Sequence, residues 1–149
     1  MDTKGQHLLV EYYGCQKGIL DDVRRVETLL KQAATAAGAS VVQSVFHKFA
    51  PQGVSGVVVI EESHLSVHTW PESGYAAVDF YTCGDCFPER AHQTLMDGLC
   101  PSKAEIMFVE RGLQGRRSMQ VQDHRVDINE AGANDDPASS ASTVSLRNS

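Results

Sequence analysis

The stretch from residue 61 to residue 86 holds the densest set of side chains that could do chemistry. It reads EESHLSVHTWPESGYAAVDFYTCGDC and combines histidines, carboxylates, hydroxyls, a tryptophan and two thiols. These residue types allow three kinds of site: a histidine metal site, a thiol pair, and a serine nucleophile.

The two histidines of this stretch, His64 and His68, are four positions apart. On a helix this spacing would place both imidazoles on one face, as zinc requires. The residues around them favour a strand instead, and at that rise the two positions lie about 13 Å apart. The glutamate of an HExxH pattern is also absent. We therefore predict no metal ligands from these histidines.

The thiols Cys83 and Cys86 form a C-x-x-C pair between an expected strand and an expected helix. This is the setting of a thioredoxin-like redox motif. The chain lacks the alternating βαβ order of that fold, and no second C-x-x-C completes a four-thiolate zinc site. Two reduced cysteines are the simpler interpretation.

Ser63 follows Glu62 and precedes His64, without the G-x-S-x-G pattern of hydrolases. An ordinary serine hydrolase is therefore not expected. A hydroxyl that attacks its own peptide bond needs less machinery, because its carbonyl target is already adjacent in the chain.

The block that contains Ser63 resembles the prokaryotic S-adenosylmethionine decarboxylase proenzymes. The similarity rests on ESHLSVHTWPE at 62–72, YAAVD at 75–79 and TCG at 82–84, and extends to FHKF at 46–49, PQGVSG at 51–56 and Arg111-Gly112. It covers roughly residues 7–112.

The resemblance implies that the chain cuts itself between Glu62 and Ser63 and converts Ser63 into a covalent pyruvoyl cofactor. It further implies that His68 transfers the proton that drives this processing and that Ser55 steadies the ester intermediate. Cys83 is then the proton donor of the catalytic reaction.

The resemblance also implies the substrate and its contacts. Phe49 and Trp70 match the aromatics that sandwich the adenine, and Glu72 matches the carboxylate that holds the ribose hydroxyls. The reaction would be decarboxylation of S-adenosylmethionine to the aminopropyl donor of spermidine synthesis. A homodimer of cleaved protomers, with sites built from both chains, is expected as well.

Three alternatives stay open at this point. Relatives decarboxylate arginine or ornithine with the same pyruvoyl chemistry, although Phe49, Trp70 and Glu72 favour a nucleoside. The chain could also be an unprocessed binding or regulatory subunit, or a protein that uses the Cys83/Cys86 thiols.

The elements that must position these residues form an α+β pattern. We expect two helices, over 21–37 and from Pro88 to about Leu99, with Asp21 capping the first. Strands are expected at His7–Tyr13, Val41–Phe49, Ser55–Ile60, Leu65–Trp70, Tyr75–Thr82 and Lys103–Glu110. Runs of adjacent strands predict a two-layer sandwich, with a mainly antiparallel sheet and both helices on one face.

One odd interval constrains the site within this fold. Ser63 and His68 are five positions apart, so a regular strand would place them on opposite faces. We expect a turn at 61–63 between two hairpin strands, with His68 and Trp70 on a shared face.

Composition limits the partners and the extent of the domain. The net charge is −6, and no basic cluster larger than a pair occurs, which argues against nucleic acid or an anionic membrane as a partner. No segment has the length of a signal peptide core or a membrane span, so a cytoplasmic protein is expected. Residues 1–115 should form one domain, while the polar, acidic composition of 116–149 predicts a flexible tail.

Overall fold

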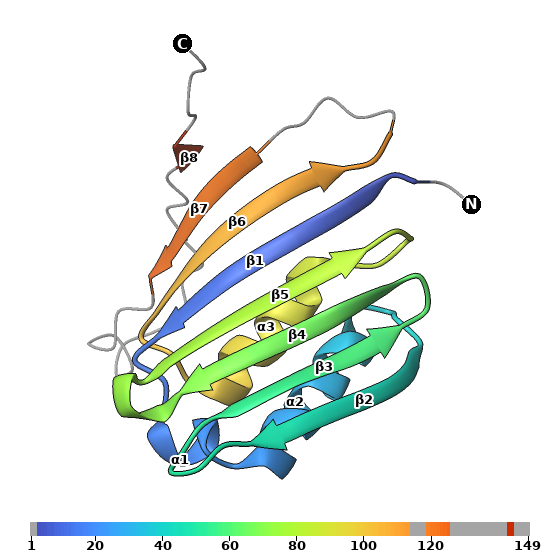
Figure 1. Cartoon of the computed structure of the whole chain (residues 1–149). Coiled ribbons are helices and arrows are strands. Elements are labelled where there is room, and N and C mark those ends of the chain that lie inside the picture. Colours follow the sequence, from blue (N-terminus) through green and yellow to red (C-terminus); the bar gives the residue numbers. More distant parts are fainter. Residues whose placement is uncertain (1–2, 114–118, 126–142, 145–149) are drawn as a thin grey trace.

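The chain is built around one antiparallel sheet (Figure 1). The computed structural model describes residues 3–113, 119–125 and 143–144. Eight strands lie in the order β2-β3-β4-β5-β1-β6-β7-β8. They are β1 (Gly5–Tyr13), β2 (Val41–Lys48), β3 (Val54–Ile60), β4 (Ser63–Trp70), β5 (Tyr75–Thr82), β6 (Lys103–Arg111), β7 (Met119–Arg125) and β8 (Thr143–Val144).

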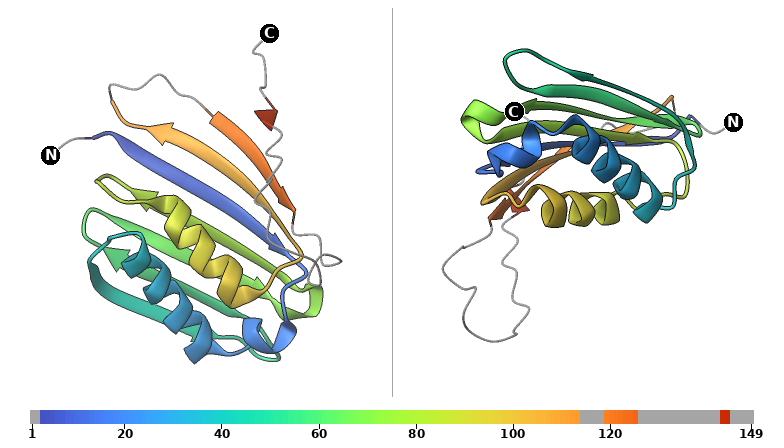
Figure 2. Two further views of the ribbon diagram at one scale, coloured as in Figure 1. Left: turned by 180° about the vertical axis from the view of Figure 1, so that it is seen from behind. Right: turned by 90° about the horizontal axis from the view of Figure 1, so that it is seen from below.

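Helices cover one face of this sheet, as the two views of Figure 2 show. They are α1 (Lys17–Leu20), α2 (Val23–Ala36) and α3 (Pro88–Leu99); a 3₁₀ turn, η1 (Pro71–Ser73), joins β4 to β5. The prediction of an α+β sandwich with both long helices on one face is confirmed. The short helix α1 has too few residues to leave a periodic signal, and it was not expected.

Strand alternation divides the side chains between a buried face and an open face. On β4, Leu65, Val67 and Thr69 are buried beneath the helices, while His68 and Trp70 are exposed. Because successive strand residues point to opposite sides, the whole polar set of β4 belongs to the open face. Burial of side chains such as Leu65 contributes about 1.5–3 kcal/mol each, which fixes the register against a slip of one residue.

Two adjacent aspartates before helix α2 have different roles: one caps the helix, and the other holds the loop between β2 and β3. Its N-cap is Asp22, whose side chain accepts a hydrogen bond from the Arg25 backbone N–H at 3.1 Å. The prediction of Asp21 as the cap was therefore wrong by one residue. Asp21 instead accepts a hydrogen bond from the Gly53 N–H at 2.9 Å and forms an ion pair with Lys48, so it holds the loop between β2 and β3.

The other helices and strands that were predicted begin and end within two residues of the predicted positions. The C-terminal range differs, because no strand was predicted there. Strands β7 and β8 lie within the range 116–149, and β7 pairs with β6. The predicted tail otherwise lies outside the described residues. Among the described residues, no helix has both the length and the apolar character needed to cross a membrane.

Candidate active site

Ser63 lies at the start of β4, immediately after a tight turn. Ile60 pairs with Ser63 across the hairpin, so Glu61 and Glu62 alone form the turn. Glu62 has a φ of 64°, in the left-handed region, which costs a non-glycine residue about 1–2 kcal/mol. The turn expected at 61–63 is therefore present but covers 61–62 alone, because Ser63 is already the first residue of β4. The strained residue is the one that precedes Ser63.

The Ser63 hydroxyl is buried but, unlike most buried polar groups, makes no hydrogen bond to any described residue. An unpaired buried hydroxyl costs about 1–3 kcal/mol and calls for an explanation. Together with the strain at Glu62, this cost is concentrated at one peptide bond, Glu62–Ser63.

Cys83 lies at the same end of the sheet as Ser63. It directly follows β5, whose residue Tyr81 pairs with His64 of β4. The thiol is free and partly exposed, and its hydrogen bond with the Tyr81 hydroxyl raises the pKa of Tyr81. A reachable thiol next to the start of β4 is therefore available as a proton donor.

Ser55 and His68 form a second, separate pair. They face each other across β3 and β4, and the Ser55 Oγ lies 2.7 Å from His68 Nδ1 in a hydrogen bond. Each is held by a regular strand, so the pair is fixed in place before any ligand arrives. A hydroxyl bonded to an imidazole is a unit suited to proton transfer.

This pair lines a cavity with the residues expected to bind substrate. The cavity measures about 330 Å³, and its walls include Phe49, Ser55, His68, Trp70 and Glu72. Such a volume is at the lower end of small-molecule sites. Three other lining residues lie within the motifs of the resemblance, but nothing in the sequence indicated a role for them in the site: Gln52, Gly53 and Thr69.

Trp70 and Phe49 present aromatic surface to this cavity. Trp70 and Phe49 are 41% and 45% exposed, and Tyr75 stacks on the Trp70 ring at 5.1 Å between centroids and 21° between planes. One face of the indole is thus supported by protein. The expectation that His68 and Trp70 share a face is met, with their rings 6.2 Å apart.

The predicted site residues therefore fall into two groups within one chain. Glu62, Ser63 and Cys83 lie at one end of the central strands, and the cavity residues lie at the other. Along β4 the five-residue interval from Ser63 to His68 spans about 17 Å. The strand is regular over this interval, so the two side chains do not share a face.

Comparison with known proteins assigns this arrangement to a family. The family model described as S-adenosylmethionine decarboxylase matches residues 6–112. This chain belongs to the S-adenosylmethionine decarboxylase family. The resemblance drawn from the block around Ser63 is thereby confirmed.

Individual members of the S-adenosylmethionine decarboxylase family agree with this assignment. A proenzyme of that name from Thermotoga petrophila is 50% identical over 113 residues, which are 75% of this chain and 87% of the relative. One from Caldanaerobacter subterraneus subsp. tengcongensis is 64% identical over 85 residues, 57% of this chain and 68% of the relative. The crystal structure of the adenosylmethionine decarboxylase from Aquifex aeolicus matches with a TM-score of 0.70 and 35% identity, covering 79% of this chain and 98% of that one.

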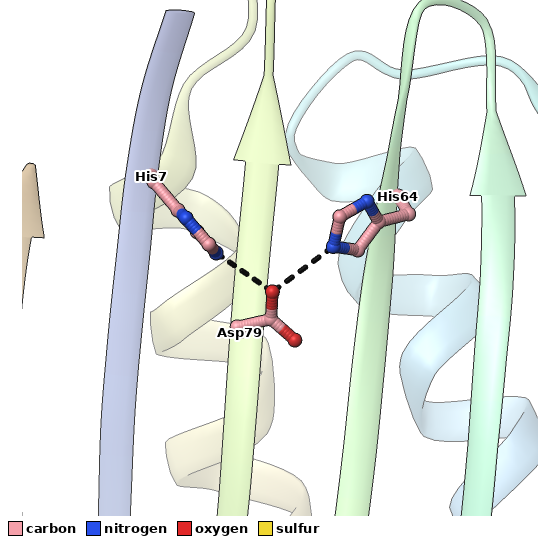
Figure 3. Close-up of side chains that lie close together, drawn as sticks. All are labelled: His7, His64 and Asp79. Atoms are coloured by element: carbon pink, nitrogen blue, oxygen red, sulfur yellow. Dashed lines mark hydrogen bonds and ion pairs between the residues drawn. The ribbon is translucent and has the colours of Figure 1, made fainter. Parts of the chain in front are cut away.

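A cluster that sequence reasoning did not single out lies on the open face beside these decarboxylase residues. Asp79 Oδ2 lies 2.7 Å from His7 Nε2 and 3.0 Å from His64 Nε2 (Figure 3). Burial alone would raise the pKa of Asp79, but hydrogen bonds from Ser66, His7 and His64 outweigh it and lower that pKa. His64 thus forms a cluster with His7 and Asp79, while His68 lies further along the same strand.

The missed residues of this decarboxylase share a reason for being missed. His7 and Asp79 are distant in sequence and meet because β1 and β5 are neighbours in the sheet. Thr69 is buried, where its Oγ1 accepts from the Val54 N–H at 2.9 Å and donates to the Leu20 carbonyl at 2.7 Å. The β-pairing register, which no local motif reports, would have been the signal.

Proposed function

We propose that the chain cuts itself between Glu62 and Ser63, keeps a pyruvoyl group at residue 63, and uses it to decarboxylate S-adenosylmethionine. The product would be the aminopropyl donor for spermidine synthesis. The observation that carries the proposal is the Ser63 hydroxyl, which is buried next to the strained Glu62 and has no hydrogen-bond partner in the part of the chain that the structure describes, in a chain of this family.

The overall reaction rests on the family. The sequence prediction of S-adenosylmethionine decarboxylation is confirmed by the family match and by the relatives named as proenzymes of this enzyme. Decarboxylation of arginine or ornithine is not favoured by these matches. A purely regulatory or thiol-based role is not favoured either.

Self-cleavage would begin with attack of the Ser63 Oγ on the Glu62 carbonyl carbon. The acyl group moves from nitrogen to oxygen, which frees the Ser63 amine and forms an ester. Loss of the Ser63 α-proton then expels the Glu62 carboxylate and leaves dehydroalanine. Water converts that group to a pyruvoyl and releases ammonia, so the atoms balance. Relief of the left-handed strain at Glu62 favours the first step.

The residues around Ser63 are suited to the pyruvoyl group. When formed, its carbonyl supplies the electron sink that decarboxylation of an amino acid requires. The Ser63 position is partly buried, which protects a reactive carbonyl from water. Cys83, at the same end of the sheet, would deliver a proton to the substrate carbon after carbon dioxide leaves.

The cavity supports a nucleoside substrate with a positive charge. Phe49 and Trp70 offer aromatic faces on which a purine can stack and near which a sulfonium cation is favoured. Tyr75 already occupies one face of Trp70, so a purine would take the other. The Glu72 carboxylate lines the same cavity and can accept hydrogen bonds from ribose hydroxyls.

Two copies of the chain would be needed to complete one site. His68 cannot remove a proton at Ser63 of its own chain, because general bases act within about 3 Å and the interval is about 17 Å. A closed dimer with its two-fold axis through the middle of the sheet would bring the Ser63 end of one copy to the His68 end of the other.

The open sheet face supports this dimer. It carries Val45, Val57 and Val59, no helix of the described residues covers it, and Val45 and Val59 are 59% and 40% exposed. Exposed apolar side chains gathered on one face are typical of surfaces that associate. We therefore propose a homodimer of cleaved chains.

An intact-mass measurement of the purified protein tests the proposal. Self-cleavage predicts two chains of 62 and 87 residues, the larger without a free amino terminus. Ser63→Ala should leave one uncut chain. A parent protein that stays full length on prolonged incubation would refute the proposed function.

A further inference from the structure

We propose that His7, His64 and Asp79 form a binding site for a divalent transition-metal ion of the Zn²⁺ class. The three side chains come from neighbouring strands, β1, β4 and β5, and converge on the open face of the sheet (Figure 3). None of them belongs to the machinery proposed above, so this inference stands or fails independently of self-cleavage.

The cluster has nearly the dimensions of a metal site. His7 Nε2, His64 Nε2 and an Asp79 carboxylate oxygen lie within 4.8 Å of one another. Metal–nitrogen bonds of about 2.0–2.1 Å place tetrahedral ligands about 3.4 Å apart. The two contacts to Asp79, at 2.7 and 3.0 Å, would therefore open by less than 1 Å.

The donor set selects the kind of ion. Two imidazoles and one carboxylate suit Zn²⁺, Co²⁺ or Ni²⁺, whereas Mg²⁺ and Ca²⁺ favour all-oxygen shells. The Asp79 Oδ1 accepts a hydrogen bond from Ser66, which orients the carboxylate and leaves Oδ2 to face the imidazoles. Such outer hydrogen bonds are typical of metal-binding carboxylates. Three protein ligands leave further positions on the ion for water.

Arg111 competes with a metal ion for His7, because each requires a different tautomer of the imidazole. Its Nη1 lies 3.3 Å from His7 Nδ1, and a guanidinium can only donate, so Nδ1 accepts and Nε2 carries the proton given to Asp79. A metal on Nε2 requires the opposite tautomer, with the proton on Nδ1. Arg111 must then release His7, and it can do so while its guanidinium stays over the Tyr81 ring, 4.5 Å from the centroid.

Cobalt titration of the untagged, chelator-treated chain tests the site by visible absorption. We expect one equivalent of Co²⁺ to bind with ligand-field bands but without the sulfur charge-transfer band that the Cys83/Cys86 thiols would give. His64→Ala and Asp79→Asn should each weaken binding about tenfold or more. His47→Ala removes an exposed histidine on the edge strand β2, which is separated from β4 by β3, and should change nothing.

Arg111→Ala keeps the test informative even if a ligand variant fails to fold. Removing the competing donor should tighten binding, because His7 no longer has to break a hydrogen bond. Parent-like affinity in His64→Ala and Asp79→Asn, unchanged or weaker affinity in Arg111→Ala, a sulfur charge-transfer band, or no binding by the parent would each overturn the proposal.

Discussion

Co-expression of two inactive variants should restore self-cleavage if the processing histidine acts across a dimer. One chain carries His68→Ala and keeps Ser63, and the other carries Ser63→Ala and keeps His68. Only a mixed dimer then contains a pair of intact residues, and it contains one. Expressed alone, the His68→Ala chain should process about 10²–10⁴-fold more slowly than the parent, the usual contribution of a positioned acid or base.

The size of the rescue follows from the geometry. The regular strand β4 holds Ser63 and His68 about 17 Å apart, so action within one chain is excluded at the 3 Å range of proton transfer. Random pairing of equal amounts of the two chains makes about half of all dimers mixed. In each mixed dimer the His68→Ala chain is cut, so about one quarter of all chains should be cleaved.

Intact mass spectrometry reads this result directly when the two chains carry tags of different length. Cleavage should appear solely in the His68→Ala chain. Co-expression of two differently tagged Ser63→Ala chains is the matched control, and it should give no fragments. A mixed sample that stays uncut, while both variants still form dimers, would refute the reasoning.

Three further predictions concern separate residues. Cys83→Ala should leave self-cleavage intact but lower kcat for decarboxylation about 10²–10⁴-fold, and loss of cleavage in this variant would contradict its role as the later proton donor. Thr69→Val should lower the free energy of unfolding by about 1–3 kcal/mol, measured by urea denaturation, whereas Thr28→Val on the exposed side of α2 should have little effect. Burial raises the pKa of Cys15 to about 12, so in the native protein its thiol should resist iodoacetamide at pH 8, while exposed Cys100 reacts. The neutral Cys15 thiol stabilises the folded state below about pH 9, and this contribution to the free energy of unfolding should be lost as the pH rises toward 12.

The sequence predicted the secondary structure well because the residue patterns are strong. Alternation on β4 and β5 and the helical spacing of Val26, Leu30 and Ala33 agree with what is buried. The error at the start of α2 arose because Asp21 and Asp22 are adjacent and equally able to cap. The contacts of Asp21 with the Gly53 N–H and with Lys48 determine that this carboxylate is used elsewhere.

The site was predictable as a set of residues but not as an arrangement. The motif around Ser63 named both Ser63 and His68 as candidate residues, yet a motif does not report distance. Strand regularity over β4 turns their five-residue interval into a separation that a single chain cannot bridge. The cluster of His7, His64 and Asp79 could not be predicted from the sequence for a related reason. The order of the strands in the sheet brings His7 to Asp79, and no spacing along the chain reports that order.

The division of the site into two ends bears on how the reaction is controlled. Ser63 and Cys83 depend on the turn after β3 and the loop after β5, whereas Ser55, His68 and Trp70 depend on the opposite ends of the same strands. If two copies complete each site, an isolated chain holds the strained Glu62–Ser63 bond without the base that drives its elimination. Processing would then follow assembly, and the cleavage rate at low protein concentration should fall with dilution. A rate independent of concentration under conditions in which the chain is monomeric would place the base elsewhere.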